Sequence, residues 1–131
     1  MNAYIDSSAF VKLLSLEPET DALLQWFADH QPTLFASELL RTEVLRAVRR
    51  FDPKGLLAAK ELLHTVNLLA VPSSTFARAA ELDPPVLRSL DALHLASALD
   101  LGDDLDVLVT YDDRLAEACT LRDVAVVAPS T

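Results

Sequence analysis

The chain has 131 residues, of which 51% are hydrophobic, and 11 Lys and Arg stand against 20 Asp and Glu, for a formal net charge of −9. This length suits one domain with a proper core, residues 1–131. The acidic balance argues against a protein that coats nucleic acid and favours binding of cations or a basic partner. The high hydrophobic fraction fits large buried faces or an apolar patch that a partner covers.

Three features predict a cytoplasmic protein with no membrane segment. The longest charge-free run, 62–77, is interrupted by polar residues and a proline and falls short of the ~20 apolar residues that a membrane span needs. Asp6 comes too early in the chain for a signal peptide. Cys119 is the single cysteine and cannot form an internal disulfide, which fits a reducing compartment.

The chain begins with a predicted strand, 2–5, that ends at an acid. Asp6-Ser7-Ser8 then leads into a predicted helix, 9–16. Asp6 either caps this helix or binds a ligand, because open parallel sheets bind ligands at the carboxyl ends of their strands. A second helix, 19–30, follows. The apolar residues of the two helices form either core or a groove for a partner peptide: Phe10, Leu13, Leu14, Leu23, Leu24 and Phe27.

A second strand, 33–36, is followed by Ser37 as the expected cap of a helix that runs to about residue 51. Glu43 interrupts the apolar face of this helix. A buried carboxylate needs a partner, here either an arginine or a metal ion. A second face of the same helix is basic and carries Arg46, Arg49 and Arg50. It is either solvated surface or a surface that binds phosphate.

The middle of the chain predicts a helix over 56–65, a strand over 66–71 and a helix that Ser73-Ser74 caps and that runs to about residue 82. Prolines then break the chain before a helix over 89–99. The apolar residues of this helix recur at helical spacing and predict its core face: Leu90, Leu93, Ala96 and Leu99.

Asp91 is the only charge in the 89–99 helix, and it either caps the helix or binds a cation. His94, one turn later, is interpreted as a packing or hydrogen-bonding residue, with metal ligation as the alternative.

The strand 107–110 is uncharged and β-branched, and it leads directly into Tyr111-Asp112-Asp113. A helix over 114–122 and a strand over 125–128 complete the chain. Strands and helices alternate with no hairpin signal, which predicts an α/β fold with one parallel sheet between two layers of helices.

Four acids coincide in this arrangement: Asp6, Glu43, Asp91 and Asp112. Two of them follow strands, and two lie on helices near the same edge of the sheet. Clustered carboxylates without matching bases repel one another and raise one another's pKa. The cluster therefore favours a site for a hard divalent cation, Mg²⁺ or Mn²⁺.

At these residues the chain resembles the PIN-domain ribonucleases, and among them the VapC toxins of bacterial toxin–antitoxin pairs. Four segments carry the resemblance: Tyr4-Ile5-Asp6-Ser7-Ser8-Ala9, Glu38-Leu39-Leu40-Arg41-Thr42-Glu43-Val44, Leu90-Asp91-Ala92-Leu93-His94-Leu95-Ala96 and Val109-Thr110-Tyr111-Asp112-Asp113-Arg114-Leu115. The resemblance covers essentially the whole chain.

The resemblance implies a three-layer α/β/α sandwich and a Mg²⁺- or Mn²⁺-dependent endoribonuclease. It implies that Asp6, Glu43, Asp91 and Asp112 bind the metal, with Ser7 and Thr110 as supporting residues. Asp113 is an alternative to Asp112. It also implies a homodimer and a small antitoxin protein that covers the site.

Metal bound by these acids would activate a water molecule for attack on an RNA phosphodiester, and Arg46, Arg49 or Arg50 would hold the RNA backbone. Two other classes compete with this interpretation. A phosphoacceptor receiver domain also gathers acids at strand ends, but it needs a lysine late in the chain, and none follows Lys60. A catalytically silent PIN-fold interaction module would not need all four acids.

Overall fold

A parallel sheet of five strands lies at the centre of the protein, for which a computed structural model describes residues 1–131. The strands run in the spatial order β3-β2-β1-β4-β5. They are β1 (Asn2–Ile5), β2 (Thr33–Ser37), β3 (Asn67–Leu69), β4 (Val107–Val109) and β5 (Val126–Val127).

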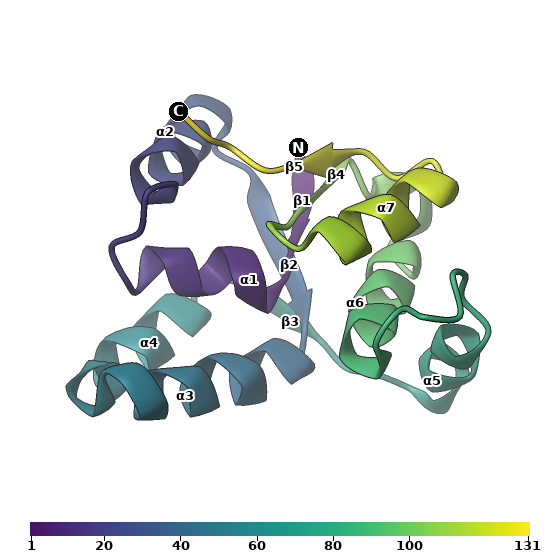
Figure 1. The fold of residues 1–131 in the computed structure, drawn as a ribbon, viewed down its shortest axis with the longest axis horizontal. Coiled ribbons are helices and arrows are strands. Elements are labelled where there is room, and N and C mark those ends of the chain that lie inside the picture. The colour runs from purple at the N-terminus through teal and green to yellow at the C-terminus, as the bar shows by residue number, and fades with distance from the viewer.

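Helices cover both faces of this sheet (Figure 1). One face carries α1 (Ser7–Phe10), α2 (Thr20–His30), α3 (Leu39–Phe51) and α4 (Leu56–Leu63). The other carries α5 (Ser73–Ala80), α6 (Ser89–Leu99) and α7 (Asp113–Leu121). The three-layer α/β/α sandwich with a central parallel sheet is therefore confirmed.

The strands form the core because successive side chains point to opposite faces. In β1, Ala3 and Ile5 belong to the apolar cluster under α1–α4, whereas Tyr4 belongs to the cluster under α5–α7. All three are fully buried. Burial on both faces explains why the strands read as apolar runs without alternation.

The topology places a ligand site at the carboxyl ends of β1 and β4. β1 pairs with β2 on one side and with β4 on the other, and Ile5 is in register with Val109. Connections leave β1 and β4 toward opposite halves of the sheet, and such a switch point is where open α/β sheets bind ligands. Asp6 and Thr110 directly follow the paired residues.

The elements occur in the predicted order, but several are shorter than expected. The predicted helix over 9–16 begins earlier, at Ser7, and after Phe10 it tightens into a 3₁₀ turn, Val11–Leu13. The strands predicted over 66–71 and 125–128 pair only over Asn67–Leu69 and Val126–Val127.

Two predicted caps are wrong. Ser37 is the last residue of β2, and its backbone N–H donates to the Tyr4 hydroxyl at 3.1 Å. Glu38 precedes α3 without a side-chain capping bond. Ser73 and Ser74 lie inside α5, where Pro72 takes the capping position. Strand pairing and proline geometry decide these boundaries rather than serine side chains.

The predicted core face of α6 is confirmed only in part. Ala96 is fully buried, and Leu93 and Leu99 pack against the core, but Leu90 is 48% exposed. The buried residues of the helix are Ala92 and the run from His94 to Ala98. The helix packs against α5, α7 and β2, so neighbours enclose it on several sides. The small residues of α6 permit this close packing.

Candidate active site

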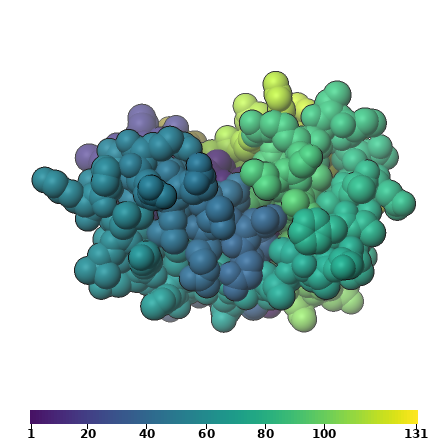
Figure 2. Space-filling view, turned by 90° about the horizontal axis from the view of Figure 1, so that it is seen from below, coloured from purple at the N-terminus to yellow at the C-terminus, as the bar shows by residue number.

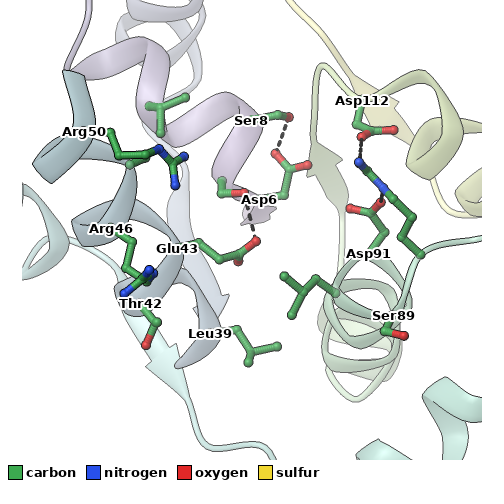
Figure 3. A pocket seen from close by; sticks show the side chains of 15 residues that line it. Asp6, Ser8, Leu39, Thr42, Glu43, Arg46, Arg50, Ser89, Asp91 and Asp112 are labelled. Atoms are coloured by element: carbon green, nitrogen blue, oxygen red, sulfur yellow. Dashed lines mark hydrogen bonds and ion pairs between the residues drawn. The ribbon is translucent and has the colours of Figure 1, made fainter.

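A cavity of about 670 Å³ lies at the carboxyl edge of the sheet, between α3 and α6. Figure 2 shows the surface hollowed between the half of the molecule that contains α3 and the half that contains α6. All four predicted acids line the cavity (Figure 3). They come from four separate segments: Asp6 from the end of β1, Glu43 from α3, Asp91 from α6 and Asp112 from the start of α7.

Asp6 both caps α1 and faces the cavity. One carboxylate oxygen accepts from the Ser8 hydroxyl at 2.7 Å and from the Ala9 backbone N–H at 3.0 Å. The other accepts from the Thr110 hydroxyl at 2.6 Å. Burial raises the pKa of Asp6, and the hydrogen bonds from Thr110 and Ser8 oppose that rise. The two interpretations of Asp6 are therefore compatible, and Thr110 supports it directly.

Asp112 has the same double arrangement. Its Oδ1 accepts from the backbone N–H groups of Arg114 at 2.9 Å and Leu115 at 3.1 Å, which caps α7. Its Oδ2 is held by the guanidinium of Arg88, which also lines the cavity. Asp113 is exposed and does not line the cavity, so the structure brings Asp112 and not Asp113 to the other acids.

Arg88 lies between two of the acids and was not predicted. Its Nε donates to Asp91 Oδ2 at 3.0 Å, and its Nη2 donates to Asp112 Oδ2 at 2.8 Å. The expectation of acids without a matching base is therefore wrong at this corner of the cavity. The available signal was its position three residues before Asp91, one helical turn away.

Asp91 does not cap α6. The capping position belongs to Arg88, and the only hydrogen bond to the Asp91 side chain comes from the Arg88 guanidinium. Asp91 lies in the first turn of the helix, where the helix dipole favours a negative charge.

The partner of Glu43 is a histidine and not the arginine that the sequence suggested. Its Oε1 lies 2.5 Å from His94 Nε2, and its Oε2 accepts from the Ser7 hydroxyl at 3.2 Å. His94 is only 1% exposed, and its Nδ1 lies 2.8 Å from the Tyr4 hydroxyl. The interpretation of His94 as a hydrogen-bonding residue is confirmed, but its partner Glu43 was not predicted.

The three arginines of α3 separate into two groups. Arg46 and Arg50 line the cavity on the side away from Asp91 and Asp112 (Figure 3). Arg49 lies outside it, on an adjoining small hollow that it shares with the other two. The cavity thus has acids at its centre and basic side chains on opposite rims.

The chemistry of this donor set fits a hard divalent cation. Carboxylate and hydroxyl oxygens are the ligands that Mg²⁺ and Mn²⁺ prefer. No three acidic, histidine or cysteine side chains converge on a single ion position, because Arg88 holds Asp91 and Asp112 while His94 holds Glu43. The guanidinium between two acids shows that this corner of the cavity binds a positive charge.

The PIN domain family matches residues 3–121. The chain belongs to this family. It is 43% identical to Ribonuclease VapC46 of Mycobacterium tuberculosis over 127 residues, 97% of each chain. It is 41% identical to Ribonuclease VapC35 of the same species over 129 residues, 96% of each chain. The predicted membership among VapC-like PIN domains is confirmed.

Solved structures share the fold. A toxin–antitoxin complex from Klebsiella pneumoniae superposes with a TM-score of 0.76 at 20% identity, over 98% of each chain. Mycobacterium tuberculosis VapC20, described as a toxin that cleaves the sarcin–ricin loop, superposes with a TM-score of 0.75 at 17% identity, over 89% of this chain and 95% of that one. None of the helices here has the length and apolar character to cross a membrane.

Proposed function

We propose that this protein is a metal-dependent endoribonuclease and the toxin of a toxin–antitoxin pair. The observation that carries the proposal is the gathering of four acids from distant segments at one cavity, in a chain that is 43% identical to a VapC ribonuclease. We propose Asp6, Glu43, Asp91 and Asp112 as the ligands of Mg²⁺ or Mn²⁺. When bound, the metal supplies charge neutralisation and acidifies water for attack on a phosphodiester.

Residues that line the cavity or lie directly behind it have separate roles in this proposal. Thr110 and Ser8 fix the orientation of Asp6, and Ser7 does the same for Glu43. Arg46 and Arg50 contact the phosphates of the RNA on one rim, with Arg49 at the edge of the same path. This local basic rim offsets the net charge of −9, which would otherwise repel RNA.

A small antitoxin is the proposed protein partner. An apolar groove of about 310 Å³ lies among α1, α2 and α4 and is lined by Phe10, Leu13, Leu24 and Phe27 together with Pro32, Leu34 and Leu62. Of the six residues predicted for such a groove, four line it; Leu14 and Leu23 pack in the core instead. The groove and the acid cavity share no lining residue, so a segment seated in the groove would need a basic extension to reach the acids.

The homodimer and the cytoplasmic location belong to the same proposal. Large apolar side chains on or next to α5 and α6 are exposed and supply a candidate face for a second copy: Phe76, Val86 and Leu90. The buried free thiol of Cys119 fits a reducing compartment.

Cleavage of total cellular RNA, with sequencing of the new ends, tests the activity. Wild type is expected to cut at defined sites with Mn²⁺ or Mg²⁺ and not in chelator. Asp91→Asn keeps the shape of the side chain but removes a charged ligand. Changes to outer-shell residues can lower activity by ~100-fold, so loss of a ligand should lower the cleavage rate by at least that factor. Mn²⁺ should also raise the melting temperature of wild type more than that of Asp91→Asn.

The same assay separates the enzyme from a catalytically silent interaction module. A folded wild type that leaves total RNA intact with both metals, and whose melting temperature Mn²⁺ does not change, would favour the silent module. Equal cutting by Asp91→Asn would remove Asp91 from the site.

A further inference from the structure

A chain of three buried side chains connects the centre of the sheet to the acid cavity. Tyr4 on β1 is fully buried, and its hydroxyl lies 2.8 Å from His94 Nδ1. His94 on α6 is 1% exposed, and its Nε2 lies 2.5 Å from Glu43 Oε1. Glu43 is the member of the chain that reaches the cavity.

The surroundings of Tyr4 set the direction of these hydrogen bonds. The Ser37 backbone N–H donates to the Tyr4 hydroxyl oxygen at 3.1 Å. Of the two hydrogen-bond partners of the Tyr4 oxygen, the Ser37 N–H can only donate, so His94 Nδ1 is the partner that can accept the phenol proton. Burial raises the pKa of Tyr4, which keeps that proton on the phenol. With the phenol as donor, Nδ1 carries no hydrogen and the imidazole proton lies on Nε2, which faces the Glu43 carboxylate.

We propose that His94, held in this tautomer by Tyr4, is a positioning residue that orients Glu43 for metal binding; this inference rests on the proposed function. Glutamate has a long, flexible side chain, and fixing it on binding costs conformational entropy. His94 and Ser7 donate to different oxygens of Glu43 and hold it before the metal arrives. Each carboxylate oxygen retains a lone pair for the ion.

A purely structural histidine is the alternative, since buried polar groups need partners wherever they lie. The two interpretations predict different effects of His94 on metal affinity. Outer-shell donors typically contribute 10–100-fold to metal affinity, whereas a structural hydrogen bond contributes to stability alone.

Mn²⁺ affinity, measured by calorimetry on folded full-length variants, separates the two interpretations. His94→Leu removes the donor to Glu43 and is expected to weaken Mn²⁺ binding by about 10–100-fold. His94→Gln keeps an N–H donor on a side chain of similar length and is expected to recover much of that affinity. Tyr4→Phe removes only the hydroxyl, and an intermediate weakening is expected.

Thr75→Val is the matched control. Thr75 is 1% exposed, and its hydroxyl donates to Asp100 at the end of α6, away from the cavity. This substitution should lower the melting temperature, because it removes a buried hydrogen bond, and should leave Mn²⁺ affinity unchanged.

Nitrogen NMR of the histidine side chains tests the tautomer without metal. The chain has three histidines, and the His94→Gln spectrum identifies the signals of His94. Wild type is expected to show a proton on Nε2 and none on Nδ1, and Tyr4→Phe should mix the tautomers.

Two results would overturn the inference. One is a proton on Nδ1 in wild type. The other is wild-type Mn²⁺ affinity in folded His94→Leu or, if that variant fails to fold, in Tyr4→Phe. Failure of wild type to bind Mn²⁺ would instead overturn the proposed metal site, while the spectra would still report whether the hydrogen-bond chain exists.

Discussion

Arg88 shows how a single residue changes the interpretation of an acid cluster. Its guanidinium bridges Asp91 and Asp112 from a side chain that is itself 62% exposed. The acids raise the pKa of Arg88, mainly through the hydrogen bond and charge of Asp91, so the bridge is fully charged at neutral pH. The rise in the pKa of Asp6, by contrast, comes mainly from burial.

Replacing this arginine should separate stability from metal binding. Arg88→Gln is expected to lower the melting temperature in chelator, because Asp91 and Asp112 lose their counter-charge. It should also increase the rise in melting temperature that Mn²⁺ produces, because the ion no longer competes with a guanidinium for two carboxylates. Thermal melts in chelator and in excess Mn²⁺ measure both effects.

Arg78→Gln controls for the removal of a surface arginine. Arg78 pairs with Asp100 at 3.1 Å on an exposed surface away from the cavity. Its Mn²⁺ shift should equal that of wild type. If Arg88→Gln shows the wild-type Mn²⁺ shift as well, Arg88 does not compete with the metal.

At the scale of elements, α3 carries two functions on neighbouring faces. Leu40, Val44 and Val48 are buried against the sheet, whereas Glu43, Arg46 and Arg50 turn toward the cavity. The helix therefore presents an acid and two bases to the same hollow. Because the charges are fixed on one rigid helix, the spacing between the acid and the basic rim is fixed as well.

The basic rim of α3 predicts a salt-dependent effect on RNA binding. The double substitution Arg46→Ala and Arg50→Ala should weaken binding of single-stranded RNA and reduce its salt slope by about 1.4, since each phosphate that an arginine neutralises adds ~0.7 to the slope. Filter binding over a series of salt concentrations in chelator, where cleavage does not occur, measures the slope. Arg49→Ala, outside the cavity, should change the slope less. Equal slopes in all three proteins would assign these arginines to solvated surface.

Sequence patterns predicted the elements and the four acids because both depend on local chemistry. A short apolar strand followed by Asp6, or by Thr110 and Asp112, is visible in adjacent residues. The pairs that organise the cavity are not local: Arg88 meets Asp112 across 24 positions and His94 meets Glu43 across 51. Such pairings follow from the strand order, which periodicity does not encode.

The enclosed helix α6 shows the same limit. Its leucine spacing predicted one apolar face, yet Leu90 is half exposed and the alanines are buried. A helix packed on several sides has no single core face, so spacing alone included Leu90 and missed Ala92, Leu95 and Ala98.

At the scale of the whole molecule, an acidic surface coexists with unusually exposed apolar side chains. Leu24 on α2 is 50% exposed and lines the groove among α1, α2 and α4, whereas Phe27 in the same groove is partly buried against the core. A partner with an amphipathic segment and basic residues would complement both features. Leu24 is thus the position where the groove can be changed with least effect on the fold.

Leu24→Asp is expected to weaken the complex with the antitoxin by about 10-fold or more, the effect typical of removing a buried interface anchor. The test partner is the antitoxin, sought as a small protein with a basic tail among the products of the neighbouring genes. Titration of labelled partner measures the affinity, and RNA cleavage by the free protein should stay at the wild-type rate because Leu24 does not line the acid cavity. Leu121→Asp, an equivalent change at a 64% exposed leucine on α7, should leave the affinity unchanged. Wild-type affinity in a folded Leu24→Asp protein would place the antitoxin on another surface.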